Sequence, residues 1–143
     1  MPKPIRIRVW GDYALFSRPE LKVERYSYDV ITPSAARGIL DSIYYHPGMI
    51  WVIDKIYVQK PIRFTNIKRN EVSAKASASK GLSALNGSNE PLFISAHDNI
   101  SQRAATVLRD VSYVIEAHFD VIPEKMSSDD SADKFFAIIM RRL

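Results

Sequence analysis

The reactive residue types present in this 143-residue chain exclude several classes of catalytic and metal-binding site. There is no cysteine, so thiol nucleophiles, disulfides and cysteine-ligated zinc are ruled out. No glycine-rich phosphate loop is present, and the histidines are too dispersed for a zinc motif: His46, His97 and His118. One carboxylate cluster stands where a helix start favours negative charge: Asp129, Asp130 and Asp133. The sequence therefore favours chemistry that needs neither a metal nor a cofactor.

Positive charge is concentrated in the first part of the chain. Residues 1–80 hold 14 Lys/Arg against 7 Asp/Glu, or +7, whereas residues 81–143 hold 6 against 9, or −3. The basic part also carries most of the large aromatic side chains: Trp10, Tyr13, Tyr26, Tyr28, Tyr44, Tyr45 and Trp51. Cations and rings together suit a polyanion whose bases can stack, and RNA is the leading candidate. The alternative is an ordinary basic domain that binds nothing.

Local patterns predict the elements that would position these residues. Alternation from Ile5 to Phe16 predicts a half-buried strand with Arg6, Arg8 and Trp10 on one face, either offered to a nucleic-acid strand or simply solvated. A helix is expected after Thr32 as N-cap and Pro33 as first helical residue, ending before Pro47. Two strands should follow, one over residues 49–58 and a shorter basic one near 62–68.

The second half of the chain contains a long segment without period. Residues 71–99 are rich in Ser, Ala, Asn and Gly, which predicts a long mobile loop that is partly disordered. Alternation over residues 106–121 predicts the longest strand, and a second amphipathic helix is expected around Phe135–Met140. The order β, α, β, β, loop, β, α is that of a single α+β ferredoxin-like (RRM-like, split βαβ) domain over residues 1–143. Its closing strand would follow Leu143, so we expect the last strand to be lacking.

Four blocks of sequence point to a family. In one order along the chain, they resemble the CRISPR-associated Cas-five protein of type I-C (Dvulg) systems, in the RAMP superfamily: WGDYALFSRPELKVE (10–24), KVERYSYDVITPSAARGILDSIYYHP (22–47), KPIRFTNIKRNEVS (60–73) and QRAATVLRDVSYVIEAHF (102–119). The resemblance covers nearly the whole chain. Members of the family continue beyond the last block into a further strand and a smaller domain, so we expect this chain to be truncated at its C-terminus.

The resemblance implies a metal-independent endoribonuclease without a cofactor. Such a protein cuts precursor CRISPR RNA at the repeat hairpin and keeps the 5′ handle within the type I-C interference complex, beside its backbone and large subunits. This implies a prokaryotic, cytoplasmic protein without a membrane partner, and a basic face also permits DNA binding. RNA supplies its own nucleophile, the 2′-hydroxyl, so cleavage needs only a base, a cation for the phosphorane and a proton for the leaving oxygen. The alternative is a non-catalytic RNA-binding scaffold that caps the 5′ handle.

The same resemblance implies the catalytic residues. The family has a tyrosine late in its first helix and a lysine at its second, followed in some members by histidine. Matching SIYYHP and DKFFAIIMRR places these at Tyr44 and Lys134, with Phe135 where the histidine would stand. His46 is the imidazole that could replace it. From the residues alone, Tyr44 could equally extend the apolar stripe of the helix, and Lys134 could be an exposed surface charge.

Seven further residues are expected to contact RNA. Cations would bind backbone phosphates and a ring would stack on bases: Arg18, Lys22, Arg25, Tyr26, Arg63, Lys68 and Arg69. For each cation the alternative is an ordinary solvated charge, and alternate tyrosines also pack within short strands.

Overall fold

The computed structural model describes residues 4–143, which form a five-stranded sheet with three helices. In chain order the elements are β1 (Ile5–Ala14), β2 (Arg25–Tyr26), α1 (Pro33–Ile43), β3 (Met49–Val58), β4 (Phe64–Val72), α2 (Ala78–Leu85), β5 (Ile100–Val121) and α3 (Ala132–Arg142). Short 3₁₀ turns precede and follow β5, at His97–Asn99 and Pro123–Lys125. The fold is therefore mixed α+β, as predicted.

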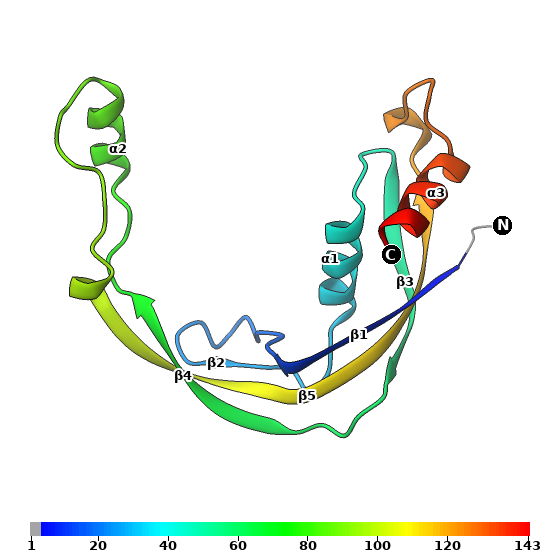
Figure 1. Ribbon diagram of the computed structural model, residues 1–143, viewed down its shortest axis with the longest axis horizontal. Coiled ribbons are helices and arrows are strands. Elements are labelled where there is room, and N and C mark those ends of the chain that lie inside the picture. Colours follow the sequence, from blue (N-terminus) through cyan, green and yellow to red (C-terminus); the bar gives the residue numbers. More distant parts are fainter. Residues whose placement is uncertain (1–3) are drawn as a thin grey trace.

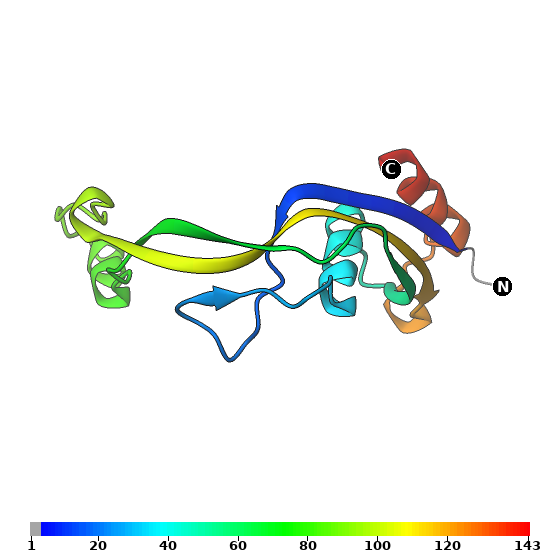
Figure 2. The same cartoon turned by 90° about the horizontal axis from the view of Figure 1, so that it is seen from below.

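Strand β5 is the spine of the sheet, because every other strand pairs with it (Figure 1). On one edge, β1 pairs antiparallel from Ile5 opposite Ala117, and β2 pairs parallel near Ala105. On the other edge, β3 pairs with the second half of β5 and β4 with the first half, both antiparallel. Residues 60–109, called the arm below, thus extend away from a body formed by the rest of the chain, and α2 lies at the tip of the arm (Figures 1 and 2).

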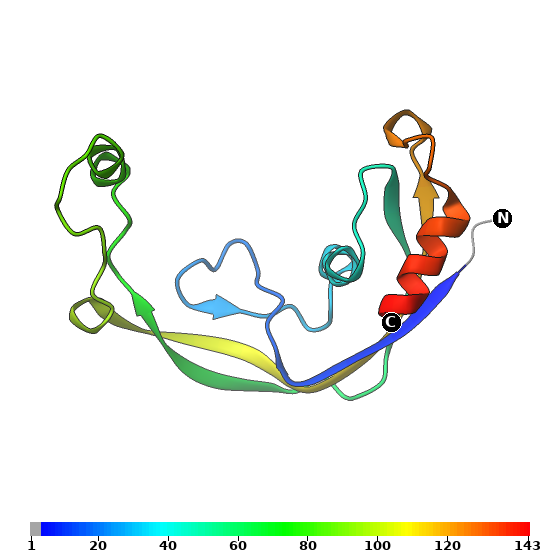
Figure 3. The ribbon, with the colours of Figure 1, turned by 45° about the horizontal axis from the view of Figure 1, so that its top comes forward.

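Helices α1 and α3 lie side by side on the concave side of the curved sheet (Figures 1 and 3). The core forms between these helices and the alternate residues of β5 that face them, among them Tyr113 and Ile115. From α3, Phe135 and Ile139 enter this core one turn apart and are completely buried. The body is therefore one hydrophobic cluster that fixes α3 against the end of α1.

The first helix begins as predicted from the sequence, whereas the N-cap of α3 was not predicted. The Thr32 hydroxyl accepts a hydrogen bond from the Ala35 amide at 3.2 Å, with Pro33 at the first helical position. At α3, the Ser131 hydroxyl accepts from the Lys134 amide at 3.1 Å. No helix of residues 4–143 is long and apolar enough to cross a membrane.

The structure corrects the prediction for residues 71–99. An entirely irregular loop was wrong, because the segment contains α2, capped by the Ser77 hydroxyl, which accepts from the Lys80 amide at 3.3 Å. None of the residues of α2 is buried, so a helical apolar stripe was never required there. Strand β5 also begins at Ile100, six residues earlier than residue 106. Mobility of this segment stays a prediction.

Candidate functional site

Tyr44 lies at the C-terminal end of α1, where the helix meets α3. Its side chain is only 7% exposed, its ring centroid is 6.0 Å from that of Phe135, and the Arg142 guanidinium lies 5.2 Å from the ring centroid. The Tyr44 carbonyl accepts a hydrogen bond from the Trp51 indole at 3.0 Å. Arg142 also donates to the Ile43 carbonyl at 2.8 Å. Tyr44 therefore extends the apolar stripe, as one reading of the sequence had it, and also meets a cation that the sequence did not point to.

His46 and Lys134 meet at a single carboxylate, Asp130. The distance from His46 Nε2 to Asp130 Oδ2 is 3.5 Å, and from Lys134 Nζ to Asp130 Oδ1 it is 3.4 Å. Lys134 also donates to the Asp129 carbonyl at 3.1 Å. The Asp130 side chain is 8% exposed, whereas that of Lys134 is 47% exposed. The structure thus brings two of the three predicted catalytic residues together through a residue that was predicted only as part of a helix start.

Two hydrogen bonds keep Asp130 ionised. The amide and the hydroxyl of Ser127 both donate to Asp130 Oδ2 at 2.9 Å, and they are the main reason that the pKa of this carboxyl lies below its ordinary value. Attraction to His46 and the hydrogen bond from Lys134 lower this pKa further. The negative charge of Asp130 therefore orients the ammonium of Lys134 and the ring of His46.

His46 is held through both of its ring nitrogens. The Gly48 amide donates to His46 Nδ1 at 3.0 Å, so Nδ1 is the acceptor and the ring hydrogen belongs on Nε2, which faces Asp130. The His46 ring also packs 4.7 Å from that of Phe135. In this arrangement His46 has no free nitrogen to accept a proton, so it is placed to orient Asp130 and the start of β3.

Phe135 fills the space between these groups. It is completely buried and contacts the rings of Tyr44, His46 and Phe119. The position that the family resemblance matches to a histidine is therefore a core position in this chain. An aromatic side chain without a titrating group satisfies it through packing.

The predicted RNA contacts lie on the arm and on the loop that precedes α1. Arg18 stands over two rings, with its guanidinium carbon 5.6 Å from the ring centroid of Tyr26 and 4.9 Å from that of Tyr28. It also pairs with Asp29 at 3.5 Å. The Tyr26 ring packs 5.5 Å from Phe64 and is 37% exposed. These residues make one stacked, partly solvated group.

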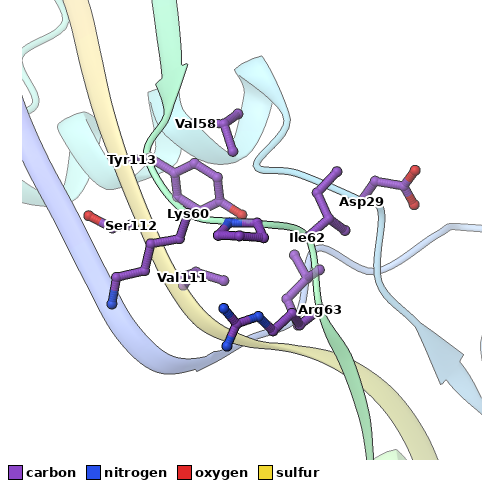
Figure 4. A pocket seen from close by; sticks show the side chains of 10 residues that line it. Asp29, Val58, Lys60, Ile62, Arg63, Val111, Ser112 and Tyr113 are labelled. Carbon is purple, nitrogen blue, oxygen red and sulfur yellow. The ribbon is translucent and has the colours of Figure 1, made fainter.

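Arg25 and Arg69 both pair with Glu71, at 3.6 Å and 2.8 Å. By contrast, Lys22, Arg63 and Lys68 are exposed, and no ion pair involves any of them within the part of the chain that the structure describes. Arg63 borders a small pocket between the arm and the body (Figure 4). The pocket holds about 10 Å³, room for one water molecule, so it is too small for a nucleotide. Figure 4 shows the cationic ends of Lys60 and Arg63 on one side of it and Asp29 on the other.

The sheet face away from the helices carries the alternating residues of β1, as predicted. Arg6 pairs with Glu116 at 2.6 Å, which lowers the pKa of that carboxyl, and the Arg8 guanidinium lies 5.3 Å from the Trp10 ring. Trp10 is 71% exposed. The face thus offers one large accessible ring beside a cation, while the second cation is already neutralised.

Comparison with known proteins adds to this geometry. A family model described as CRISPR-associated protein (Cas_Cas5), for Cas5d, matches residues 5–143. The protein named CRISPR pre-crRNA endoribonuclease Cas5d of Mannheimia succiniciproducens is 54% identical over 143 residues. The chain belongs to the Cas5d family. A protein of the same name from Thermus thermophilus is 37% identical over 139 residues.

Alignment with these Cas5d relatives covers 99% and 97% of this chain, but only 63% and 54% of the relatives' own lengths. A solved structure titled as that of a CRISPR-associated protein has a TM-score of 0.62 and 25% identity, over 99% of this chain and 55% of the other. A functionally uncharacterized protein, SMU1763c from Streptococcus mutans, has a TM-score of 0.60 at 24% identity over the same shares, which shows a common fold. The likeness to known proteins therefore includes the fold as well as the sequence. The chain spans only 54–63% of the length of each of these relatives.

Some partners of the predicted residues had no local signal in the sequence. Asp130 joins His46 across 84 positions, and Arg142 joins Ile43 across 99. On the arm, Glu71 is two residues from Arg69 on β4, but Arg103 reaches Arg69 only because β4 pairs with β5. A prediction of strand pairing would have been needed to find them.

Proposed function

We propose that this chain matures CRISPR RNA as a metal-independent endoribonuclease that cuts precursor RNA at the repeat hairpin. The proposal is supported by the names of the two Cas5d relatives, both pre-crRNA endoribonucleases. The observation that carries it is the convergence of Lys134 and His46 on Asp130, beside Phe135 and the Tyr44 ring. The strand order β1-β5-β3 with α1 and α3 on one face supports the ferredoxin-like plan.

In the proposed reaction, the 2′-oxygen attacks the adjacent phosphorus and the bond to the 5′-oxygen breaks. The products are a 2′,3′-cyclic phosphate and a 5′-hydroxyl, whose proton comes from solvent and balances the proton lost by the 2′-hydroxyl. The half-exposed ammonium of Lys134 stabilises the negative phosphorane, while Asp130 holds this side chain in place. The Tyr44 hydroxyl orients or transfers the proton that leaves the 2′-hydroxyl. His46 is a positioning residue, since both of its nitrogens are engaged.

The product remains bound through its 5′ handle in this proposal, as a subunit of the type I-C interference complex in the prokaryotic cytoplasm. Its neighbours would be the backbone and large subunits, and the basic arm also suits a DNA strand. Contacts for the RNA come from the residues predicted on the arm and the loop: Arg18, Lys22, Arg25, Tyr26, Arg63, Lys68 and Arg69.

A non-catalytic scaffold is the second candidate function. Two observations favour it, because Tyr44 is 7% exposed and the position of the histidine found in some family members is filled by the buried ring of Phe135. Such a protein would bind the 5′ handle without cutting it.

The deciding experiment incubates the purified chain with end-labelled repeat RNA in EDTA. A matched RNA carries a single 2′-deoxy nucleotide at the cut, because this change removes the nucleophile alone. One cut that persists in EDTA and disappears in the 2′-deoxy RNA is expected. Binding without cleavage would refute the nuclease and support the scaffold, while a cut that needs a divalent cation would refute the metal-independent mechanism.

A further inference from the structure

The arm carries more than the whole net charge of the chain. Residues 60–109 hold 8 Lys/Arg against 3 Asp/Glu, or +5, whereas the remaining residues hold 12 against 13, or −1. A hairpin with little core of its own would be better stabilised by mixed charges, since like charges repel. The excess therefore points to an anionic partner for this part of the molecule.

Two arginines of the arm and one of β2 gather on one face of the sheet. Pairing of β4 with β5 places Arg69 directly opposite Arg103, and pairing of β2 with β5 places Arg25 beside Ala105. Paired residues share a sheet face and every second residue returns to it, so all three side chains leave the sheet on the same face. Glu71 is on this face too, and its carboxylate is the one that pairs with Arg25 and Arg69.

One carboxylate does not satisfy these three cations. Nε and Nη2 of Arg69 are shielded from solvent and have no hydrogen-bond partner within residues 4–143, although Nη2 lies 2.8 Å from Glu71 Oε1 in an ion pair. Arg103 has no ion pair in that part of the chain. Two guanidinium groups directly opposite each other destabilise a sheet, and unmade hydrogen bonds of a charged group cost more. Such local conflicts are expected where a ligand completes the arrangement.

We propose that Arg25, Arg69 and Arg103 form a phosphate-binding site for the RNA backbone, organised by Glu71. A phosphate carries several acceptor oxygens and a guanidinium offers five donors, so the site suits this group. Glu71 holds Arg25 and Arg69 in place in the free protein. The site rests on the proposed RNA-binding function. It adds three points to that function: Arg103 contacts RNA, the three arginines share one ligand, and Glu71 organises them. The site lies at the first half of β5, whereas Tyr44 lies near the second half.

The test measures binding of repeat RNA with a 2′-deoxy nucleotide at the cut, as a function of salt, by fluorescence anisotropy. Arg103→Gln is expected to weaken binding roughly tenfold and to make the slope of log affinity against log salt shallower by about 0.7–0.9, the value for one lost phosphate contact. The matched control is Arg109→Gln, which removes the same charge from the same strand, at an exposed position where Arg103 is half-buried. Its slope should stay at the wild-type value. Equal changes in both variants would overturn the site, because they would show general electrostatic attraction.

Thermal unfolding separates binding from a structural role. Because Arg103 faces Arg69, Arg103→Gln should raise the Tm of the free protein by about 1–4 °C while it weakens RNA binding. A fall in Tm together with weaker binding would overturn the proposal and identify a structural arginine. DNA of the same sequence as a competitor shows whether the site distinguishes the sugar. Equal competition supports a site that reads phosphate alone.

Failure of the proposed function can be told apart from failure of the site. If the wild-type chain binds no RNA, the proposed function falls, and the site is tested with inorganic diphosphate by NMR of the arginine Nε–H groups. A shift of the Arg69 signal that Arg103→Gln abolishes would support the site alone. No shift would overturn it as well.

Discussion

Replacement of Tyr44 distinguishes its role in the core from its proposed role in cleavage. Tyr44→Phe keeps the ring that packs on Phe135 and lies under Arg142, and removes only the hydroxyl. We expect the free energy of unfolding to change by about 1 kcal/mol or less. A group that orients or transfers a proton contributes about 10²–10⁴-fold to the rate, so the same variant should raise the barrier by about 3–5 kcal/mol. Tyr44→Ala also empties a 7%-exposed site and should cost about 3–5 kcal/mol of stability.

The assay is single-turnover cleavage of end-labelled repeat RNA at saturating protein, with urea unfolding of each variant. The adjacent Tyr45 is the matched control, because it is 67% exposed and Tyr45→Phe removes the same hydroxyl from the surface. It should leave both quantities unchanged. If Tyr44→Phe cleaves within threefold of the wild-type rate, the reasoning is refuted and Tyr44 is a core residue alone.

Three further predictions concern the residues around Tyr44. Asp130→Asn should lower Tm at neutral pH, and the difference in Tm from wild type should close as pH falls below about 4. A carboxyl with a lowered pKa stabilises the fold above its unfolded pKa, and this stabilisation is lost as pH falls through the folded pKa. A difference in Tm that is constant from pH 7 to 3 would contradict this. Gly48→Ala should cost about 1–3 kcal/mol in urea unfolding, since its Cβ would stand 2.7 Å from a Met126 side-chain carbon and 3.1 Å from His46 Nδ1, and an unchanged midpoint would contradict it. Lys134→Gln should slow single-turnover cleavage by about 10²–10³ with little loss of stability, because the side chain is half-exposed, and a rate within threefold of wild type would exclude its role at the phosphorane.

Elements with a buried face were predictable and elements without one were not. The alternation of β1 and the apolar stripe of α1 arise because each packs one face on the core. Helix α2 buries no residue, so no stripe marks it, and its exposed Leu82 and Leu85 belong to no packed face. The first six residues of β5 lie in the arm, where no helix packs on the sheet. The alternation of apolar and polar residues is correspondingly weak there.

The candidate site was predictable only in part, because resemblance supplies residues and leaves out their partners. Tyr44 and Lys134 came from matched motifs, whereas Asp130 acquires its role when residues 126–131 fold back on His46. Phe135 was predicted as a departure from a catalytic pattern. Its complete burial among three aromatic rings gives the physical reason for an apolar side chain there.

Strand β5 sets the distance between the two proposed sites. Phe119 pairs with Trp51, whose indole binds the Tyr44 carbonyl, and Arg103 lies sixteen positions earlier on the same strand. At about 3.3 Å per residue this is roughly 50 Å along the strand, and less in a straight line because the sheet is curved. An RNA that reaches both sites must therefore extend along most of the length of β5. Since sites this far apart share no side-chain partner, substitutions at Arg103 and at Tyr44 should act independently, the first on anchoring and the second on cleavage.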